Sequence, residues 1–265
     1  MKTHKPITKE KEGFGVDYER FAIIRLSKKV VKELGIGSVV EIPAGGVKAA
    51  PSLYSIGFGL EDCKVILING EEYIRRYWKQ LGIGGNVKFL KEKSIYQTTL
   101  PDNFADLVWN YVWISKCKKP LALIKEMKRI SRRFVMCASI NGFNMGFWIH
   151  RALHKITKIP WTHGNTMLNF PHNLKGLFKK ASLKNIKMGV VDCPPWPDSL
   201  GFRDMRLHRR ARALLVKEWD PQIITLIKEA KIPRWMQLCY LIGSLPIPTV
   251  TKLIHAHVFY IIGEK

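Results

Sequence analysis

The segment with the clearest chemical potential is SVVEIPAGG, in which an apolar run meets a carboxylate and then small residues. In an open parallel sheet, a strand that ends in such a turn lets a ligand lie against backbone N–H groups. A carboxylate at the end of the strand can hold an amino group or a ribose of that ligand. The alternative is a buried strand followed by an ordinary glycine turn. The residues that would contact the ligand are Glu41, Pro43, Ala44, Gly45 and Gly46.

The elements around this segment alternate between helix and strand patterns. The residues from Asp17 to Leu34 carry apolar side chains at helical spacing, which predicts one helix or two helices with a break near Ser27. Besides the strand that begins at Ser38, strands are predicted at 64–69, 86–90, 106–113, 133–138, 186–191 and 257–263. Helices are predicted at 47–58, 71–81, 121–130 and 174–181. This alternation implies an α/β fold with a parallel sheet, whose ligands bind beyond the carboxyl ends of the strands.

The composition describes a basic chain with an ordinary apolar content. The 265 residues include 44 Lys and Arg against 21 Asp and Glu, and 46% are hydrophobic. A formal charge of +23 attracts polyanions, which include RNA, an anionic bilayer surface and acidic small molecules; alternatively it serves only solubility. The five cysteines are scattered without a Cys-x-x-Cys pair, which argues against zinc and disulfides and favours a reducing cytoplasm.

The order of these elements resembles a class I S-adenosylmethionine-dependent methyltransferase of the small-molecule "type 11" kind. VVEIPAGG is similar to the first motif of that family, and ILINGEE to the end of its second strand. LPDNFADLVWNYVWI resembles its fourth strand, PLALIKEMKRISRRFVMCAS the helix and fifth strand that follow, and HGNTMLNFPHNLKGLFKKASLKNI a later segment. The resemblance extends from Tyr18 to Gly189 and includes the last strand. It implies a Rossmann-like, doubly wound, mainly parallel sheet of about seven strands, with helices on both faces and a helical, aromatic-rich substrate cover.

The resemblance also implies a cofactor, S-adenosylmethionine (SAM), and the residues that would hold it. In addition to the five residues of the first motif, the implied cofactor-binding residues are Asn69, Gly70, Glu71, Ser94, Ile95 and Asn110. Four positions depart from the family pattern. Pro43 and Ala44 replace glycine-type positions, Asn69 stands where a carboxylate usually binds the ribose, and Lys93 stands where an aspartate usually meets the adenine. Glu71 or Glu72 could take over the ribose from the next turn.

Methyl transfer from a sulfonium needs in-line positioning and, for some nucleophiles, a base. His163 matches the histidine of the family and titrates near neutrality, so it is a candidate base, although a structural histidine is the alternative. Tyr111, at the end of the fourth predicted strand, would face the sulfonium, unless it is a packed aromatic. We therefore take His163 and Tyr111 as candidate catalytic residues. The candidate substrate-binding residues are Tyr18, Asn141, Asn165, His172 and Trp196.

Other polar side chains near the predicted site have simpler interpretations. Asp192 and Asp198 flank a proline-rich turn, where they could act as bases or only form the turn. His150 and His154 are four residues apart, which can place both rings on one helical face. Since the sequence offers no third ligand beside them, we expect no metal site.

Three stretches combine apolar and basic character in ways that concern partners. The segments 146–158 and 202–219 mix cationic with bulky apolar residues, which suits an anionic membrane surface, a phosphate backbone or a solvated face. The segment 235–250 is strongly apolar, but it is shorter than the ~20 residues of a spanning helix and is interrupted by prolines. It predicts a lid over the substrate or a monotopic membrane contact.

The sequence thus predicts a cytoplasmic methyltransferase that uses SAM and acts on an apolar or anionic small molecule of lipid-like character, with a peripheral membrane contact as a further expectation. One alternative is an RNA methyltransferase on the same fold. Another is a non-catalytic basic protein that binds RNA or membranes and has lost the cofactor site. We divide the chain into a flexible basic tail (1–16), a cofactor-binding core (17–139), a substrate cover that includes the sixth strand (140–255) and the last core strand (256–265).

Overall fold

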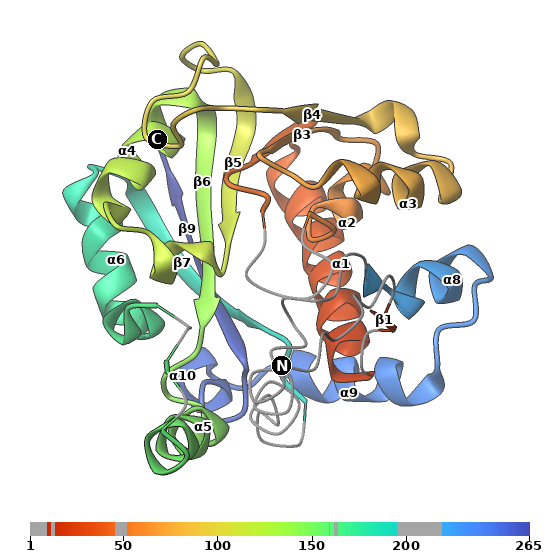
Figure 1. Ribbon diagram of the computed structural model, residues 1–265, viewed down its shortest axis with the longest axis vertical. Coiled ribbons are helices and arrows are strands. Elements are labelled where there is room, and N and C mark those ends of the chain that lie inside the picture. Colours follow the sequence, from red (N-terminus) through yellow and green to blue (C-terminus); the bar gives the residue numbers. More distant parts are fainter. Residues whose placement is uncertain (1–9, 12–13, 46–51, 159, 162–163, 195–218) are drawn as a thin grey trace, which may run out of the picture.

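A seven-stranded, mostly parallel sheet forms the centre of the protein (Figure 1). The computed structural model describes residues 10–11, 14–45, 52–158, 160–161, 164–194 and 219–265. The strands lie in the order β4-β3-β2-β5-β6-β9-β7, and β9 runs antiparallel to both of its neighbours. Their bounds are β2 Ser38–Glu41, β3 Lys64–Ile68, β4 Val87–Leu90, β5 Ala105–Tyr111, β6 Ser131–Ile140, β7 Lys184–Val191 and β9 Val258–Glu264. The predicted doubly wound fold is confirmed, and the strand order reverses between β2 and β5.

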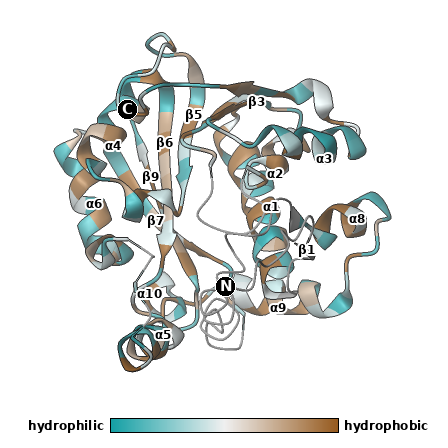
Figure 2. Cartoon of the chain, viewed as in Figure 1, coloured by the Kyte–Doolittle hydropathy of each residue, from teal (hydrophilic) through white to brown (hydrophobic). Residues whose placement is uncertain are grey.

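Helices cover both faces of the sheet because successive strand residues point to opposite sides. Val39 of β2 lies in the cluster under one helix layer, and Val40 lies in the cluster under the other. The first layer contains α1 (Phe14–Leu34), α2 (Ile56–Gly59) and α3 (Arg75–Gln80), and the second contains α4 (Pro120–Ile130) and α6 (Pro171–Lys180). In Figure 2, apolar colouring runs along β5 and β6 between these layers.

The remaining helices lie toward the edge of the sheet where β5 and β6 end (Figure 1). They are α5 (Met145–Ile156), α8 (Gln222–Lys228), α9 (Arg234–Ser244) and α10 (Thr249–Lys252). Short 3-10 helices are η1 (Glu72–Ile74), η2 (Gly84–Asn86), η3 (Trp113–Lys116) and η4 (Thr166–Asn169). A separate two-stranded sheet pairs β1 (Glu10–Lys11) with β8 (Trp219–Asp220). Within the described ranges, no helix is both long enough and apolar enough to cross a bilayer.

The first helix begins earlier than predicted and, of the two alternatives that the sequence left open, forms a single helix. It begins at Phe14 rather than at Asp17, so the predicted tail of residues 1–16 extends into the helix. It also continues without a break through Ser27, whose hydroxyl donates a hydrogen bond of 3.0 Å to the carbonyl of Ile23. A serine that bonds back to the preceding turn can remain inside a helix.

The helix predicted over 47–58 is observed only at its end, from Ile56. Residues 46–51 lie outside the described part of the chain, Ser52 has a φ of 67°, and the helix itself is only Ile56–Gly59. The glycines of α2 let it pack closely against its neighbours. A Cβ on Gly57 would lie 2.8 Å from Cα of Ile24, so α2 and α1 pack backbone against backbone. This contact depends on the tertiary fold and leaves no helical periodicity in the sequence.

Candidate functional site at the carboxyl edge of the sheet

A buried carboxyl group occupies the end of β2, next to the point where the strand order reverses. Glu41 is the last residue of β2 and its side chain is 1% exposed. Its Oε2 accepts a hydrogen bond of 2.6 Å from Ser55, whose hydroxyl accepts one of 2.8 Å from Nε1 of Trp109. The carboxyl therefore belongs to an ordered chain of donors that links β2, the α2 turn and β5.

Burial dominates the protonation of this carboxyl. It raises the pKa of Glu41 to about 7, although the hydrogen bond from Ser55 and the positive charge of Arg20 act in the opposite direction. A carboxyl with this pKa exists in both protonation states near neutral pH. It can therefore donate a hydrogen bond or carry the charge that an ammonium group prefers.

The turn after β2 lies directly against the end of β3. The N–H of Ala44 donates a 2.7 Å hydrogen bond to the carbonyl of Ile68. Ser52 links the two loops further, since its hydroxyl donates to the carbonyl of Ala44 at 2.8 Å and accepts from the N–H of Glu71 at 3.0 Å. A Cβ on Gly45 would lie 3.0 Å from the carbonyl oxygen of Asn69, so only glycine allows this approach without adjustment.

The residue at the expected ribose position has a different partner in the structure. Asn69 has a φ of 55°, and its side-chain amide pairs with the backbone of Glu92. Its Oδ1 accepts from the N–H of Glu92 at 2.9 Å, and its Nδ2 donates to the carbonyl of the same residue at 3.1 Å. Asn69 thus joins the ends of β3 and β4. The nearby Glu71 is exposed, beside the closely packed Gly70.

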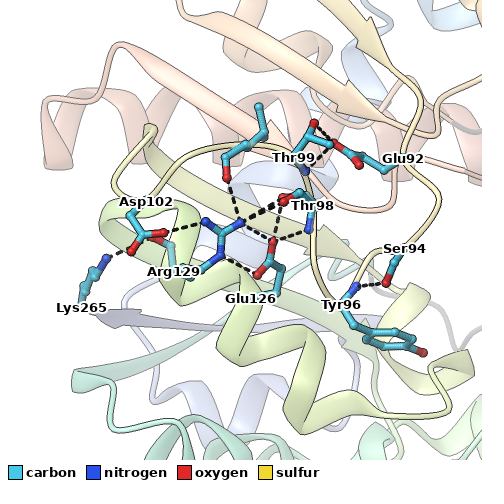
Figure 3. A network of polar contacts seen from close by, with 10 residues as sticks. Glu92, Ser94, Tyr96, Thr98, Thr99, Asp102, Glu126, Arg129 and Lys265 are labelled. Carbon is cyan, nitrogen blue, oxygen red and sulfur yellow. Dashed lines mark hydrogen bonds and ion pairs between the residues drawn. The ribbon is translucent and has the colours of Figure 1, made fainter.

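The loop between β4 and β5, which carries Lys93, Ser94 and Ile95, is held by a polar network (Figure 3). Arg129 of α4 lies at its centre, with hydrogen bonds of 2.7 Å to Oε1 of Glu126 and 2.6 Å to Asp102. These bonds raise the pKa of Arg129 above its ordinary value. Ser94 accepts from the N–H of Tyr96 at 3.1 Å, Ile95 is half-buried and Lys93 is exposed.

The polar side chains at the end of β5 are hydrogen-bonded to other residues of the protein. Asn110 is fully buried; its Nδ2 donates to the carbonyl of Ile42 at 2.7 Å and its Oδ1 accepts from the N–H of Ile114 at 2.8 Å. Tyr111 donates its hydroxyl hydrogen to Glu19 and stacks on Tyr54 with ring centroids 4.0 Å apart. These contacts fix the edge of the site, and they differ from the direct ligand contacts that we expected of Asn110 and Tyr111.

Tyr111 is a poor proton acceptor in this geometry. Burial and then the charge of Glu19 raise the pKa of its hydroxyl well above the ordinary value. The hydroxyl therefore stays protonated at neutral pH and serves as a donor to Glu19. Its catalytic role as predicted from the sequence has no support from these contacts.

A cavity of about 240 Å³ opens beside this edge, between α1, the end of β7 and α9. Tyr18, a predicted substrate-binding residue, lines it together with Asp192, Tyr240 and Lys252. Asp192 is 3% exposed; its Oδ2 lies 3.0 Å from Nδ1 of His257. Its Oδ1 is buried and has no hydrogen-bond partner among the described residues. The cavity adjoins the end of β7, which β6 and β9 separate from β5 in the sheet.

The other predicted cover residues are dispersed. Asn141 is buried and donates to the carbonyls of Leu253 and Ala256, at 2.5 Å and 2.8 Å, so it holds the loop after α10. Asn165 caps η4 through the N–H of Met167, and His172 is exposed at the start of α6. Three predicted site residues, Gly46, His163 and Trp196, lie outside the described residues.

The sequence prediction missed the buried residues that contact the candidate site residues from within the protein. Glu19 and Arg20 are buried charges on α1, and Ser52 and Ser55 are fully buried hydroxyls between β2 and β3. The one available signal was the run DYER, which places three charged residues near the start of the helix. In the described ranges, no group of three His, Cys, Asp or Glu side chains is arranged to hold a metal ion. His150 and His154 lie against each other, with Nε2 atoms 2.9 Å apart.

The comparisons with known proteins concern the fold. No protein-family model matches the chain, and no curated protein matches its sequence. Among solved structures, a SAM-dependent methyltransferase from Thermotoga maritima aligns with a TM-score of 0.53 at 15% identity, over 94% of this chain and 91% of the other.

Two further solved structures align over most of both chains. A SAM-dependent methyltransferase from Archaeoglobus fulgidus aligns with a TM-score of 0.51 at 13% identity, over 96% of this chain and 100% of the other. The YcgJ protein of Bacillus subtilis aligns with a TM-score of 0.53 at 12% identity, over 92% and 97%. The chain therefore has the fold of the class I SAM-dependent methyltransferases.

Proposed function

We propose that the protein is a SAM-dependent methyltransferase that acts on an apolar or anionic small molecule. The observation that supports this most is the edge formed by Glu41, Gly45 and the end of β3, which has the topology and close backbone approach of a nucleotide-type cradle. A shared fold alone supports many activities, so the proposal depends on this site.

The residues at the edge fit SAM through the backbone and through one exposed carboxylate. Gly45 lacks the Cβ that would press on Asn69, so the turn can lie close to β3 and leave a surface without side chains. The side-chain amide of Asn69 is hydrogen-bonded to the backbone of Glu92. Glu71, which is exposed in the next turn, is therefore the carboxylate that could bind the ribose hydroxyls. Glu41 lies at the end of β2, where its carboxylate, when ionised, would favour a positively charged group of the cofactor.

Bound SAM supplies a methyl group on a sulfonium that a nucleophile can attack in line. The protein would contribute rigid positioning: Asn110 fixes the ends of β2 and β5 through two hydrogen bonds, and the Tyr111–Tyr54 stack closes the wall beside them. The stack and the buried face of α1 exclude water from this wall. Orientation of this kind can supply a large part of the rate enhancement of a transfer reaction.

The cavity beside Tyr18 supports an apolar or anionic small molecule as the methyl acceptor. Its aromatic side chains, Tyr18, Tyr240 and Tyr260, offer an apolar surface, and Lys29 and Lys252 offer positive charge for an anionic group. Asp192 adds a buried acceptor, Oδ1, that suits a hydroxyl or amine of the substrate. With Oδ2 held by His257, Asp192 is positioned to accept a proton from that group.

The proposal is tested by methyl transfer from radiolabelled SAM to a panel of phenols, fatty acids and phospholipids. We expect label to accumulate in a product that partitions into organic solvent, and Asp192→Asn to lower the rate at least about a hundredfold. Exposed Asp62→Asn is the matched carboxyl-to-amide control for the rate, since Asp62 lies in the turn before β3, at the opposite edge of the sheet, in a conformation that asparagine also adopts. Label found only in added RNA would contradict the proposal and favour the RNA methyltransferase alternative.

A further inference from the structure

The exposed apolar side chains of this protein are gathered in two segments. Within the described part of the chain, every large apolar side chain that is strongly exposed lies in 143–167 or in 235–254. They include Trp148 and Ile156 of α5, which are 52% and 75% exposed, and Leu241 of α9 and Val250 of α10, which are 63% and 70% exposed. Contiguous exposed apolar surface on a folded protein marks a contact with another phase or molecule.

These two segments form one end of the molecule, which we call the apolar end. The side-chain amide of Asn144, at the start of α5, donates to the carbonyls of His255 and Ala256 just after α10, at 2.9 Å and 3.2 Å. In Figure 1, α5 and α10 lie side by side at the lower left, and α9 runs along the lower edge. The exposed side chains thus lie around a common end instead of on opposite sides.

The segments that form the apolar end carry basic side chains and no Asp or Glu. No Asp or Glu occurs between Met127 and Val191, or between Ala230 and Ile262. Exposed cations flank the apolar residues, namely Arg151, Lys155 and Lys158 around α5 and Arg234 at the start of α9, whereas Lys231 is paired with Glu229 at 3.0 Å. Between Trp235 and Val250 no charged residue interrupts the apolar run. An apolar patch flanked by basic side chains is complementary to a surface that is apolar inside and anionic outside.

We propose that the apolar end binds the surface of an anionic lipid bilayer. The apolar side chains of α5, α9 and α10 insert at the boundary of the acyl chains, and the flanking Lys and Arg contact the lipid headgroups. A second copy of this chain is a poor occupant, because two copies would place cationic rims of the same sign against each other. The protein lies on the bilayer without spanning it.

The apolar end faces the same side as the candidate site. Ile140, the last residue of β6, pairs with Val258, the first residue of β9, so α5 follows the carboxyl end of β6 and α10 precedes the same edge. β2 and β5 run parallel to β6, and their carboxyl ends are at that edge. A bilayer bound there would present its lipids to the edge of the sheet that carries the candidate site.

The test is flotation of the full-length protein with vesicles, without cofactor, so that its result is independent of methyl transfer. We expect co-flotation with phosphatidylcholine vesicles that contain phosphatidylserine, and about tenfold or more weaker binding to pure phosphatidylcholine or at high salt. The emission of Trp148, read as the difference between the protein and Trp148→Phe, should shift to the blue on binding.

Two pairs of variants separate the apolar and the charged contributions. Leu241→Ser with Val250→Ser should weaken binding about tenfold or more, without lowering the melting temperature, because both side chains are exposed. Arg151→Gln with Lys155→Gln should also weaken it about tenfold or more. Lys79→Gln with Lys125→Gln removes the same charge from exposed sites on α3 and α4 and should leave binding within about twofold.

Absence of flotation with anionic vesicles by a folded protein would overturn the proposal. Equal losses in the α5 and the control charge pairs would overturn it as well, because binding would then follow net charge alone. A dimer in solution that Leu241→Ser with Val250→Ser converts to a monomer would assign the apolar end to self-association instead.

Discussion

Glu41 and Gly45 define the candidate site at the scale of single residues. One is a buried carboxyl whose charge the fold partly suppresses, and the other is a glycine whose missing Cβ lets two loops meet. Both depend on neighbours that are distant in sequence, Ser55 and Trp109 for the carboxyl and Asn69 for the glycine. Each can be tested by a change of a few atoms.

Glu41 should make the protein less stable as the pH rises. Its pKa increases from 4.5 in an exposed setting to about 7 in the fold, so between these values the folded protein holds a proton that the unfolded chain has released. The free energy of unfolding should therefore fall by about 3 kcal/mol as the pH rises through this window. Urea denaturation across the window should show this loss, and Glu41→Gln should remove it. Exposed Glu33→Gln should keep the wild-type slope; an equal slope in Glu41→Gln would contradict the assignment.

Gly45→Ala should weaken SAM binding by about tenfold, since its Cβ would lie 3.0 Å from the carbonyl oxygen of Asn69 and push the two loops apart. The measurement is isothermal titration calorimetry with SAM. Gly176→Ala is the control, because a Cβ on this helical glycine meets nothing within 4 Å. That variant should keep the wild-type affinity and gain about 0.5–1 kcal/mol of stability. Unchanged affinity in Gly45→Ala would show that the turn does not contact the cofactor.

At the scale of elements, the sequence indicated where strands and helices lie and missed how they are joined. The strand predicted at 64–69 is observed at Lys64–Ile68, because a buried parallel strand needs a continuous apolar run. The helix predicted over 47–58 forms only from Ile56, because Ser52 and Ser55 bond to Ala44 and Glu41 of the neighbouring strand end, contacts that no local pattern encodes.

The same limit applies to the candidate site. The position of Asn69 was visible in the sequence, but its partner Glu92 lies 23 residues away, and Tyr111 meets Glu19 across 92 residues. Tertiary packing therefore decides which of these side chains can contact a ligand and which only stabilise the fold. Residue types at strand ends predicted a site at this edge, which stays a prediction, and the structure shows Asn69, Asn110 and Tyr111 bonded to other parts of the protein.

The network around Arg129 should determine how firmly the β4–β5 loop is held. Arg129→Met leaves the nearly buried carboxylate of Glu126 without its cation and should cost about 3 kcal/mol of unfolding free energy. Arg75→Met breaks the exposed pair with Glu72 at the same i,i+3 spacing and should cost less than about 1 kcal/mol. Urea denaturation at neutral pH compares the two variants, and equal costs would contradict the role of the network.

The effect of Arg129 should also depend on pH. Burial raises the pKa of Glu126, but the hydrogen bonds from Arg129 and Thr98 outweigh it and lower the pKa below its usual 4.5. This stabilisation is present above the usual pKa and is lost as the pH falls through the lowered value in the fold. The difference in stability between the wild type and Arg129→Met should therefore narrow in acid.

At the scale of the whole molecule, one edge of the sheet carries three features. The candidate cofactor edge, the cavity beside Tyr18 and the apolar end all lie toward the carboxyl ends of the parallel strands. The doubly wound fold was predictable because the alternation of elements allows few topologies. The arrangement of α5, α9 and α10 was not, since their exposed apolar residues follow no core periodicity.

The central claim is that the edge between β2, β3 and β4 holds SAM. Calorimetric titration of the folded, full-length protein with SAM, and separately with S-adenosylhomocysteine, tests it most directly. The account predicts saturable binding of both, with one site per chain and a dissociation constant in the range of about 1–100 µM. No detectable heat with either compound, by protein whose fold is verified by circular dichroism, would contradict it.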